Sequence, residues 1–184
     1  MSIQEKIDID IFKVVIRAIA ESDDLEIMAN RMIQLLVGAL NIKGCTIFVL
    51  NSQTKELEAL ASCGLSINYV NKGPVFMDKS LGDTLKGEPV IVSDITKTSA
   101  LQYPEDAKEE GIRSIVSMPI KFYGEPIGAL RLYHHEVWDI SDRDIDSLLL
   151  FAENIGLAMR YTQLLNSLQS IKDTINESPL DFAR

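Results

Sequence analysis

Residues 113–132 constrain the fold most, because they carry two apolar, β-branched runs on either side of a tight turn. The runs predict strands over Ser114–Phe122 and 127–133, and Gly124 between them permits the positive φ that a tight hairpin requires. Gly128 lies inside the second run, where a residue without a side chain lets another backbone or helix come close. The sequence therefore predicts an antiparallel hairpin that packs closely against a neighbour.

Two helices are expected before the first strand. Ile7, Ile11 and Val14 lie at helical spacing and predict the first of them. Residues 22–24 interrupt this pattern with side chains suited to N-capping, and a second helix is predicted over Leu25–Leu40.

Short elements follow the two helices, and most are bounded by glycine, proline or asparagine. A buried strand is predicted over Gly44–Leu50, and residues 57–62 return from it in a second hairpin. The remaining predicted segments, in order, are a loop over 65–79, a short helix over 80–87, a strand over Val90–Val92, and a charged helix opened by Pro104 and ended by Gly111.

Length and charge limit the function classes. The 184 residues are enough for one domain with appendages and a sizeable core. A net charge of −9 and a sequence pI of about 4.7 argue against binding to nucleic acid or to an anionic membrane surface. No apolar run is long enough to span a bilayer, and the first residues lack the apolar centre of a signal peptide. We therefore expect a cytoplasmic protein without nucleic-acid or membrane partners.

The last predicted helix is much longer than an average helix. Ser141 and Asp144 form a capping box at its start, and the helical pattern continues to about residue 176. One apolar stripe suits packing on the sheet: Ile145, Leu148, Leu149, Ala152, Ile155 and Met159. A second stripe has the alternating spacing of a short coiled-coil seam: Leu157, Tyr161, Leu164, Leu168, Ile171 and Ile175.

One globular body cannot easily cover both stripes, so the seam predicts a partner helix. We expect the same helix of a second copy, with the first helix completing a bundle in a homodimer. The alternative is a single helix that folds back along its own domain. This organisation divides the chain into a dimerising N-terminal helix (1–23), a central domain (24–165) and a helical extension with a tail (166–184).

The order of these segments over about residues 24–165 resembles a GAF domain. The matching motifs are Ser80-Leu-Gly-Asp83 before a strand that leads to Asp94, Ser114 followed by Pro119-Ile120, the Gly124 turn, Gly128-Ala-Leu130, and Ile140-Ser141 with Asp144. The resemblance implies an α+β fold, a central antiparallel sheet with the terminal helices packed on one face. It also implies a ligand pocket on the other face, beneath an irregular lid over 65–112. A PAS-type sensor, also a sheet with flanking helices, is the alternative fold.

The implied pocket draws attention to three residues of the lid, since long irregular connections in a compact domain are commonly functional. Asp94 at a strand end and Tyr103 could face a ligand, and Arg113 could pair an anionic ligand group. Each has a competing structural role. Asp94 could cap the following turn, Tyr103 could anchor the loop, and Arg113 could pair with Glu109 or Glu110 on the surface.

The features that mark known subclasses of the family are missing from this sequence. The Asn-Lys…Phe…Asp-Glu signature of cyclic-nucleotide-binding members is absent, and no cysteine lies where bilin-binding members attach their pigment. Free methionine-sulfoxide reductases of this fold use loop cysteines, whereas Cys45 and Cys63 lie in the first hairpin. We expect no disulfide framework. His134 and His135 end a strand, where neighbours point to opposite faces, so no metal site is predicted.

The sequence therefore predicts a regulatory module rather than an enzyme, with no catalytic residues. It would bind an unidentified small molecule, with or without a cofactor of unknown identity, and act through dimerisation helices on a separate effector protein. Two alternatives stay open. One is an interaction module whose pocket is filled by its own side chains, and the other is a small cysteine-dependent redox enzyme.

Overall fold

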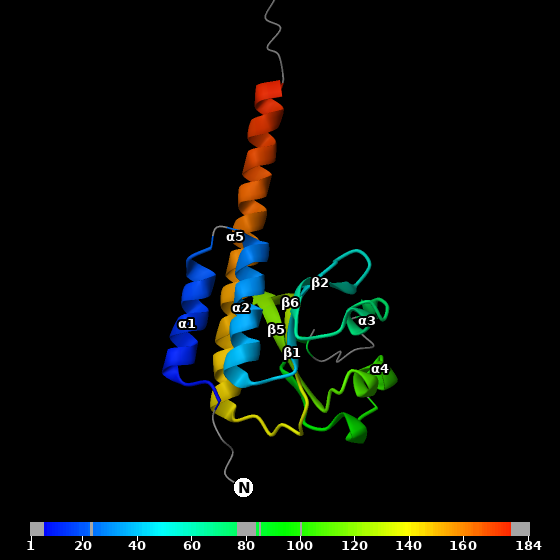
Figure 1. Cartoon of the computed structure of the whole chain (residues 1–184). Helices are drawn as coiled ribbons and strands as arrows, with labels where there is room; N and C mark the ends of the chain where they lie inside the picture. Colours follow the sequence, from blue (N-terminus) through cyan, green and yellow to red (C-terminus); the bar gives the residue numbers. More distant parts are fainter. Residues whose placement is uncertain (1–5, 23, 77–83, 85, 100, 178–184) are drawn as a thin grey trace, which may run out of the picture.

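The structure, a computed structural model, describes residues 6–22, 24–76, 84, 86–99 and 101–177. Its centre is a six-stranded sheet in the order β3-β2-β1-β6-β5-β4, and every pairing between neighbouring strands is antiparallel (Figure 1). The strands are β1 (Gly44–Leu50), β2 (Glu56–Cys63), β3 (Val75–Phe76), β4 (Val90–Val92), β5 (Ser114–Phe122) and β6 (Glu125–His134). The predicted α+β class with a central antiparallel sheet is confirmed.

Helices cover the two faces of the sheet unequally. The long helices pack on one face: α1 (Ile9–Ala20), α2 (Leu25–Leu40) and α5 (Asp142–Glu177) (Figure 1). The opposite face, here called the lid face, carries the short elements α3 (Ile67–Val70), η2 (Ile95–Lys97) and α4 (Pro104–Glu109). Both predicted hairpins and the bounds of the second helix are confirmed.

The main hydrophobic core lies between the sheet and the long helices. Leu130 and Leu132 of β6 and Ile33 and Leu36 of α2 are fully buried there. Phe151 of α5 is also fully buried, and its ring stacks on that of Phe12 with centroids 5.1 Å apart. This pair ties α1 to α5.

The helix α5 divides into a buried half and an exposed half. The sheet-facing stripe predicted from the sequence is confirmed, because Leu148, Ala152 and Ile155 are fully buried. Beyond Met159 the helix extends past the body of the protein (Figure 1). The residues of the seam are 54–68% exposed. Among the described residues, no helix is sufficiently long and apolar to cross a membrane.

The structure corrects the predicted start of the first helix. Ile7 precedes α1 instead of lying in it, although its side chain is only 2% exposed. The helix starts at Ile9 because the Asp8 carboxylate caps it, accepting hydrogen bonds from the backbone N–H groups of Asp10 (2.9 Å) and Ile11 (2.8 Å).

The predicted loop over 65–79 is also wrong in part. It contains α3, capped by the Ser66 hydroxyl, and β3, which adds to the sheet by pairing with Glu56 and Leu57 of β2. β3 has only two residues and forms by backbone pairing with β2, so it is too short to show the alternating pattern that predicts a strand. The predicted helix over 80–87 lies mostly outside the described residues.

Candidate functional site

The lid is held together by polar contacts between its first and last parts. Glu110, which ends α4, accepts hydrogen bonds from the Ser66 hydroxyl and from the Ser66 backbone N–H, the latter at 3.0 Å. Its carboxylate is also 3.2 Å from the ammonium of Lys43, next to β1. Hydrogen bonds from Ser66 and the charge of Lys43 hold the pKa of Glu110 below its usual value although burial opposes them.

Two apolar clusters lie beneath the lid. One is built around Tyr69 of α3 and Tyr133 of β6, whose rings meet edge to face at 5.7 Å. The other joins Phe48 of β1 to Leu57 of β2 and Val75 of β3. Both ends of the lid face are therefore occupied by the chain's own side chains.

A row of polar side chains crosses the lid face between these clusters, and we call it the polar row. It consists of Ser62, Thr46, Arg131 and Ser117, which are direct register partners across β2, β1, β6 and β5. The hydroxyls of Ser62 and Thr46 lie 3.0 Å apart. Thr46, Arg131 and Ser117 are each at most 5% exposed. Buried polar side chains such as these are costly unless they are hydrogen-bonded.

The two central members of the polar row differ in their contacts. The Arg131 guanidinium lies 5.2 Å from the centre of the Phe48 ring and hydrogen-bonds the Tyr133 side chain. The Ser117 hydroxyl is fully buried and has no hydrogen-bond partner among the described residues. The sequence analysis missed both residues, although an arginine between two leucines in an apolar strand was a usable signal.

Positive charge extends from the polar row towards the lid surface. The Lys72 ammonium lies 3.7 Å from the centre of the Tyr69 ring and donates a hydrogen bond to the Tyr69 carbonyl oxygen at 2.9 Å. Burial, aided by the charge of Arg131, lowers the pKa of Lys72 to about 8. Burial also raises the pKa of Tyr69 and of Tyr133, so both phenols are neutral.

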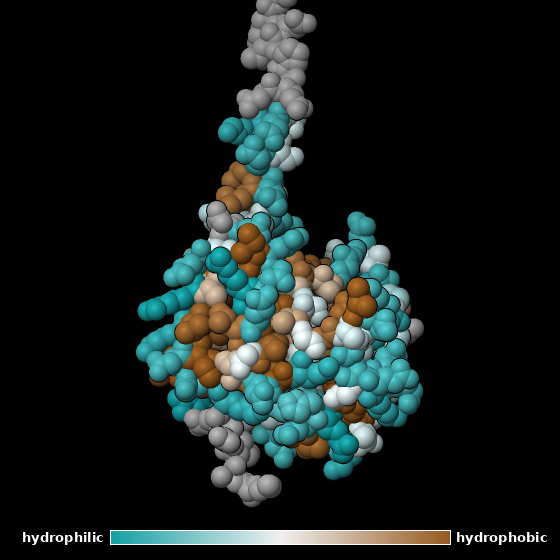
Figure 2. Space-filling view, viewed as in Figure 1, coloured by the Kyte–Doolittle hydropathy of each residue, from teal (hydrophilic) through white to brown (hydrophobic). Residues whose placement is uncertain are grey.

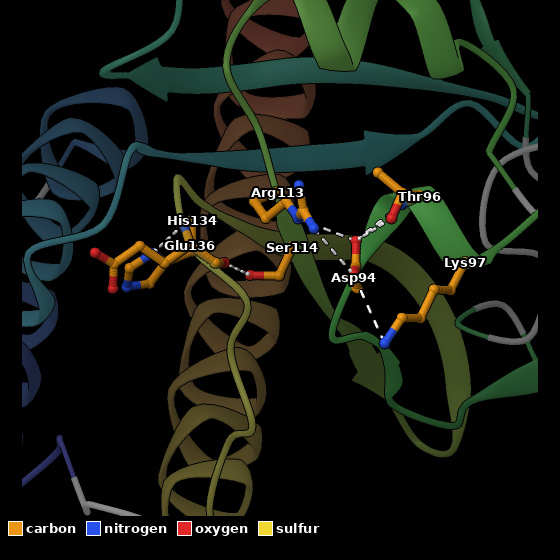
Figure 3. Close-up of polar contacts among 7 residues, drawn as sticks. All are labelled: Asp94, Thr96, Lys97, Arg113, Ser114, His134 and Glu136. Atoms are coloured by element: carbon orange, nitrogen blue, oxygen red, sulfur yellow. Dashed lines mark hydrogen bonds and ion pairs between the residues drawn. The ribbon is translucent and has the colours of Figure 1, made fainter.

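Asp94 and Arg113, two of the residues predicted to bind a ligand, contact each other (Figure 3). Arg113 Nε lies 3.1 Å from Asp94 Oδ1, and Nη2 donates to Oδ2 at 3.3 Å. Asp94 also caps η2 by accepting from the Thr96 N–H (3.0 Å) and hydroxyl (2.7 Å). These Thr96 bonds, with help from Arg113, hold the pKa of Asp94 below its usual value. Arg113 therefore pairs with Asp94 and not with Glu109 or Glu110, because the β4 end lies beside the β5 start.

Tyr103 lies away from that pair and anchors the lid. Its hydroxyl donates a hydrogen bond to the Pro74 carbonyl oxygen at 2.8 Å. Gln102 beside it donates to the same oxygen at 2.9 Å and accepts from the Phe76 N–H at 3.0 Å. Whether Asp94, Tyr103 or Arg113 touches a ligand remains a prediction, and their contacts show that all three hold the lid in place.

A second polar cluster, which the sequence analysis also missed, joins the N-terminal segment to the sheet and to α5. Asp144 is fully buried and accepts hydrogen bonds from the backbone N–H groups of Lys6 (2.9 Å) and Ile7 (2.8 Å). The Asp144 N–H donates to the Ser141 hydroxyl at 3.0 Å. The predicted capping box is therefore half formed, because the Asp144 carboxylate binds a distant segment instead of the helix start.

His134 of β6 completes this second cluster. Its Nδ1 accepts a hydrogen bond from the Glu136 N–H at 3.0 Å (Figure 3). Its Nε2 lies 2.8 Å from Lys6 Nζ. The tautomer of the ring sets which of Nε2 and Nζ donates in this contact. Burial lowers the pKa of Lys6, and the charges of Glu136 and Asp144 oppose this only in part.

The prediction that His134 and His135 point to opposite faces of a strand is wrong. The strand β6 ends at His134, so strand alternation does not apply to His135, and the two rings lie 4.6 Å apart. With Glu136 they offer three possible ligand atoms within 4.8 Å of one another. Both His134 nitrogens already make hydrogen bonds, however, so a metal ion would have to displace Lys6 or the Glu136 N–H.

The state of His134 predicts a pH dependence of stability. Burial, with the nearby Lys6 and His135 charges, lowers its pKa from 6.5 to about 4, and Glu136 opposes this only in part. Between these two values the unfolded chain binds a proton that the folded chain does not, so stability falls as the pH drops from 6.5 to 4. The slope contributed by His134 is at most about 1.4 kcal/mol per pH unit.

Urea unfolding at a series of pH values measures this slope. His134→Gln should flatten it within the window, and His135→Gln should retain most of it, because burial is the main cause of the His134 shift. Equal slopes for the wild type and His134→Gln would contradict the assignment.

The side chains of the α5 seam lie on the surface of the single chain. Figure 2 shows hydrophobic side chains along the protruding part of α5 and over the helical layer beside it. The start of the seam lines a groove, in which Leu157 and Tyr161 of α5 face Ile16 and Ile19 of α1. The seam thus begins where α1 and α5 lie side by side.

Comparison with known proteins identifies a family. The family model described as GAF domain matches residues 22–160. A comparison with curated protein sequences gave no match.

Three solved structures illustrate the similarity in fold. The GAF domain of a phosphoenolpyruvate-protein phosphotransferase from Coxiella burnetii is 19% identical with a TM-score of 0.76, covering 86% of this chain and 95% of that one. A free methionine-R-sulfoxide reductase from Neisseria meningitidis, in complex with its substrate, is 13% identical with a TM-score of 0.72, covering 89% and 98%. A domain of a putative two-component sensor histidine kinase from Sinorhizobium meliloti 1021 is 19% identical with a TM-score of 0.68, covering 80% and 99%. At these identities the similarity establishes the fold.

Proposed function

Because this chain belongs to the GAF domain family, we propose that it is a regulatory module that binds a small molecule at the polar row and acts through α5 on a separate effector protein. The observation that carries the proposal is the Ser117 hydroxyl, buried under the lid without a partner among the described residues. Buried polar atoms are nearly always hydrogen-bonded, so an unpaired one beneath a lid marks a place for a ligand.

The chemistry of the polar row favours a small ligand with hydrogen-bond acceptors. Arg131 supplies a buried positive charge, and Thr46 and Ser117 supply hydroxyls on either side of it. An acceptor or anionic group between them would receive hydrogen bonds in a region of low dielectric, where such bonds are strong. Asp94 and Arg113 are engaged with each other, so the polar row is the better position for the ligand.

Native mass spectrometry of protein purified without added ligand, compared with its denatured mass, tests ligand binding. We expect an extra mass that is lost on denaturation. Ser117→Ala, which removes only the hydroxyl, should reduce the fraction of protein that carries this mass several-fold, while Ser52→Ala in the exposed β1–β2 turn should leave that fraction unchanged. A bare protein that gains no mass from a cell extract would contradict the ligand proposal.

The output of the module is proposed to be a homodimer through the α5 seam. The six seam residues are exposed in one chain, and helix residues with this spacing pair with a second helix. α1 exposes Ile9 (58%) and Val14 (47%) and would complete the bundle. A ligand that moves the sheet would change the pose of α5, which packs directly on β5.

Sedimentation velocity measures this dimer. We expect a dimer for the wild-type chain, and Leu164→Lys with Leu168→Lys should raise its dissociation constant by at least about 10³-fold, because each change replaces a leucine that the dimer would bury with a charged side chain. Asn166→Lys with Gln169→Lys adds the same charge to the opposite side of α5 and should leave the dimer intact. A wild-type monomer at micromolar concentration would overturn the seam assignment.

One observation supports an interaction module without a ligand as a second candidate. Side chains of the two apolar clusters fill both ends of the lid face. A wild-type dimer that binds no small molecule would favour this candidate. The structure supports a cysteine-dependent enzyme least, because Cys45 is fully buried and burial raises the pKa of its thiol.

A further inference from the structure

The two cysteines of the chain face each other across the first hairpin. Cys45 of β1 and Cys63 of β2 are direct register partners in an antiparallel pair, so their side chains leave the sheet on the same face. That face is the one covered by the long helices, since Cys45 belongs to the main core and Cys63 packs against the same core. Both are free thiols.

The geometry of this pair fits a disulfide. Directly opposed residues in an antiparallel pair have Cα atoms about 4.5–5.5 Å apart, and disulfides span Cα separations of about 4.4–6.8 Å. The strands also approach closely here, because a Cβ on Gly44 would lie 2.7 Å from the Cys63 carbonyl oxygen. The register therefore places the two thiols side by side on one face, within the range of Cα separations that disulfides span.

We propose that Cys45 and Cys63 form a reversible intrachain disulfide when the protein meets a hydroperoxide, which makes this end of the hairpin an oxidant-responsive modification site. The proposal does not depend on ligand binding, because the pair lies on the opposite face of the sheet from the polar row.

The order of the two steps follows from exposure. Cys63 is partly exposed, so its thiolate attacks the peroxide oxygen, the O–O bond breaks, and the products are a sulfenic acid and water. The Cys45 sulfur then attacks the Cys63 sulfur, and the leaving hydroxide takes the Cys45 proton to become the second water. Two thiols are oxidised and one peroxide is reduced. Cys45 is fully buried, so the peroxide reaches Cys63 first.

The position of the pair connects it to the lid. The lid begins two residues after Cys63, and Ser66 hydrogen-bonds Glu110 at the other end of the lid. Glu110 pairs in turn with Lys43, two residues before Cys45. A disulfide between Cys45 and Cys63 would therefore join β1 to β2 close to Lys43 and Ser66, the two residues that bind Glu110 of the lid.

Mass spectrometry of the reduced full chain treated with hydrogen peroxide tests the proposal. We expect a monomeric product lighter by two hydrogen atoms, restored by dithiothreitol. Lys55 lies between the cysteines, so trypsin separates them, and a non-reducing digest should contain the Cys45 and Cys63 peptides joined. A product that only gains oxygen, or a disulfide only between two chains, would overturn the proposal.

Two variants separate the roles of the thiols. Cys63→Ser should slow the reaction with peroxide at least about tenfold, because the remaining thiol is buried. Cys45→Ala should stop the reaction at the sulfenic acid of Cys63, which dimedone traps. Since the wild-type digest gives the decisive result, a folding defect in Cys45→Ala would not affect the test. Equal rates for Cys63→Ser and the wild type would also overturn the proposal.

Discussion

Replacing Gly128 by alanine should prevent the chain from reaching its native fold, or destabilise it by more than about 4 kcal/mol. A Cβ at this position would lie 2.2 Å from the Phe48 carbonyl oxygen, a distance that real Cβ atoms do not reach. That oxygen belongs to backbone and cannot rotate away. Gly128 also pairs with Val49 on one side and Ile120 on the other, so β6 cannot shift without breaking a ladder.

Urea unfolding followed by circular dichroism measures this effect, and Gly38→Ala is the matched control. A Cβ at Gly38 in α2 would meet nothing within 4 Å, so the same substitution should stabilise the protein by about 0.5–1 kcal/mol. Native domains are stable by only about 5–15 kcal/mol, so the two variants should also differ in the yield of soluble protein. A Gly128→Ala protein within about 1 kcal/mol of wild type would refute the close approach of β1 and β6.

Asp144→Ala should destabilise the protein by about 3 kcal/mol, because it removes a buried carboxylate that accepts two backbone hydrogen bonds. The bonds from the Lys6 and Ile7 N–H groups measure 2.9 and 2.8 Å, and they fix the segment that leads into α1. Their loss should free α1 from the body as well. We therefore expect faster tryptic cleavage after Lys13 and Arg17 in this variant than in the wild type.

Asp142→Ala is the control for this prediction. Asp142 lies in the same first turn of α5 but is exposed, so its removal loses only the favourable interaction with the helix dipole, about 0.5 kcal/mol. Urea midpoints and cleavage rates should separate the two variants clearly. Equal effects would mean that Asp144 acts through the helix dipole and not as the anchor of the N-terminal segment.

Local patterns predicted the elements whose formation depends on neighbours in sequence. The Gly124 turn, the bounds Leu25–Leu40 and the Ser141 start of α5 follow from turn chemistry, periodicity and capping, and all three are confirmed. The seam was also readable, since an exposed stripe repeats within a single helix. β3 and α3 were missed because one forms by pairing with β2 and the other spans only four residues.

The site was less predictable than the fold, because its residues are brought together only across strands. Asp94, Tyr103 and Arg113 attracted attention as polar residues in an irregular segment, yet all three make contacts that hold the lid. Arg131 and Ser117 lie in different strands, and only the β5–β6 register makes them neighbours.

The sequence by itself determined two hairpins and a long amphipathic helix, because periodicity and turn residues act over a few positions, and its resemblance to a GAF domain implied the α+β fold with a central antiparallel sheet. Tertiary structure alone decided the polar row, the facing pair of Cys45 and Cys63, and the binding of Lys6 and Ile7 by Asp144. Each of these depends on strand register or on a contact between distant segments. Register is fixed by the burial of whole faces and not by any one residue.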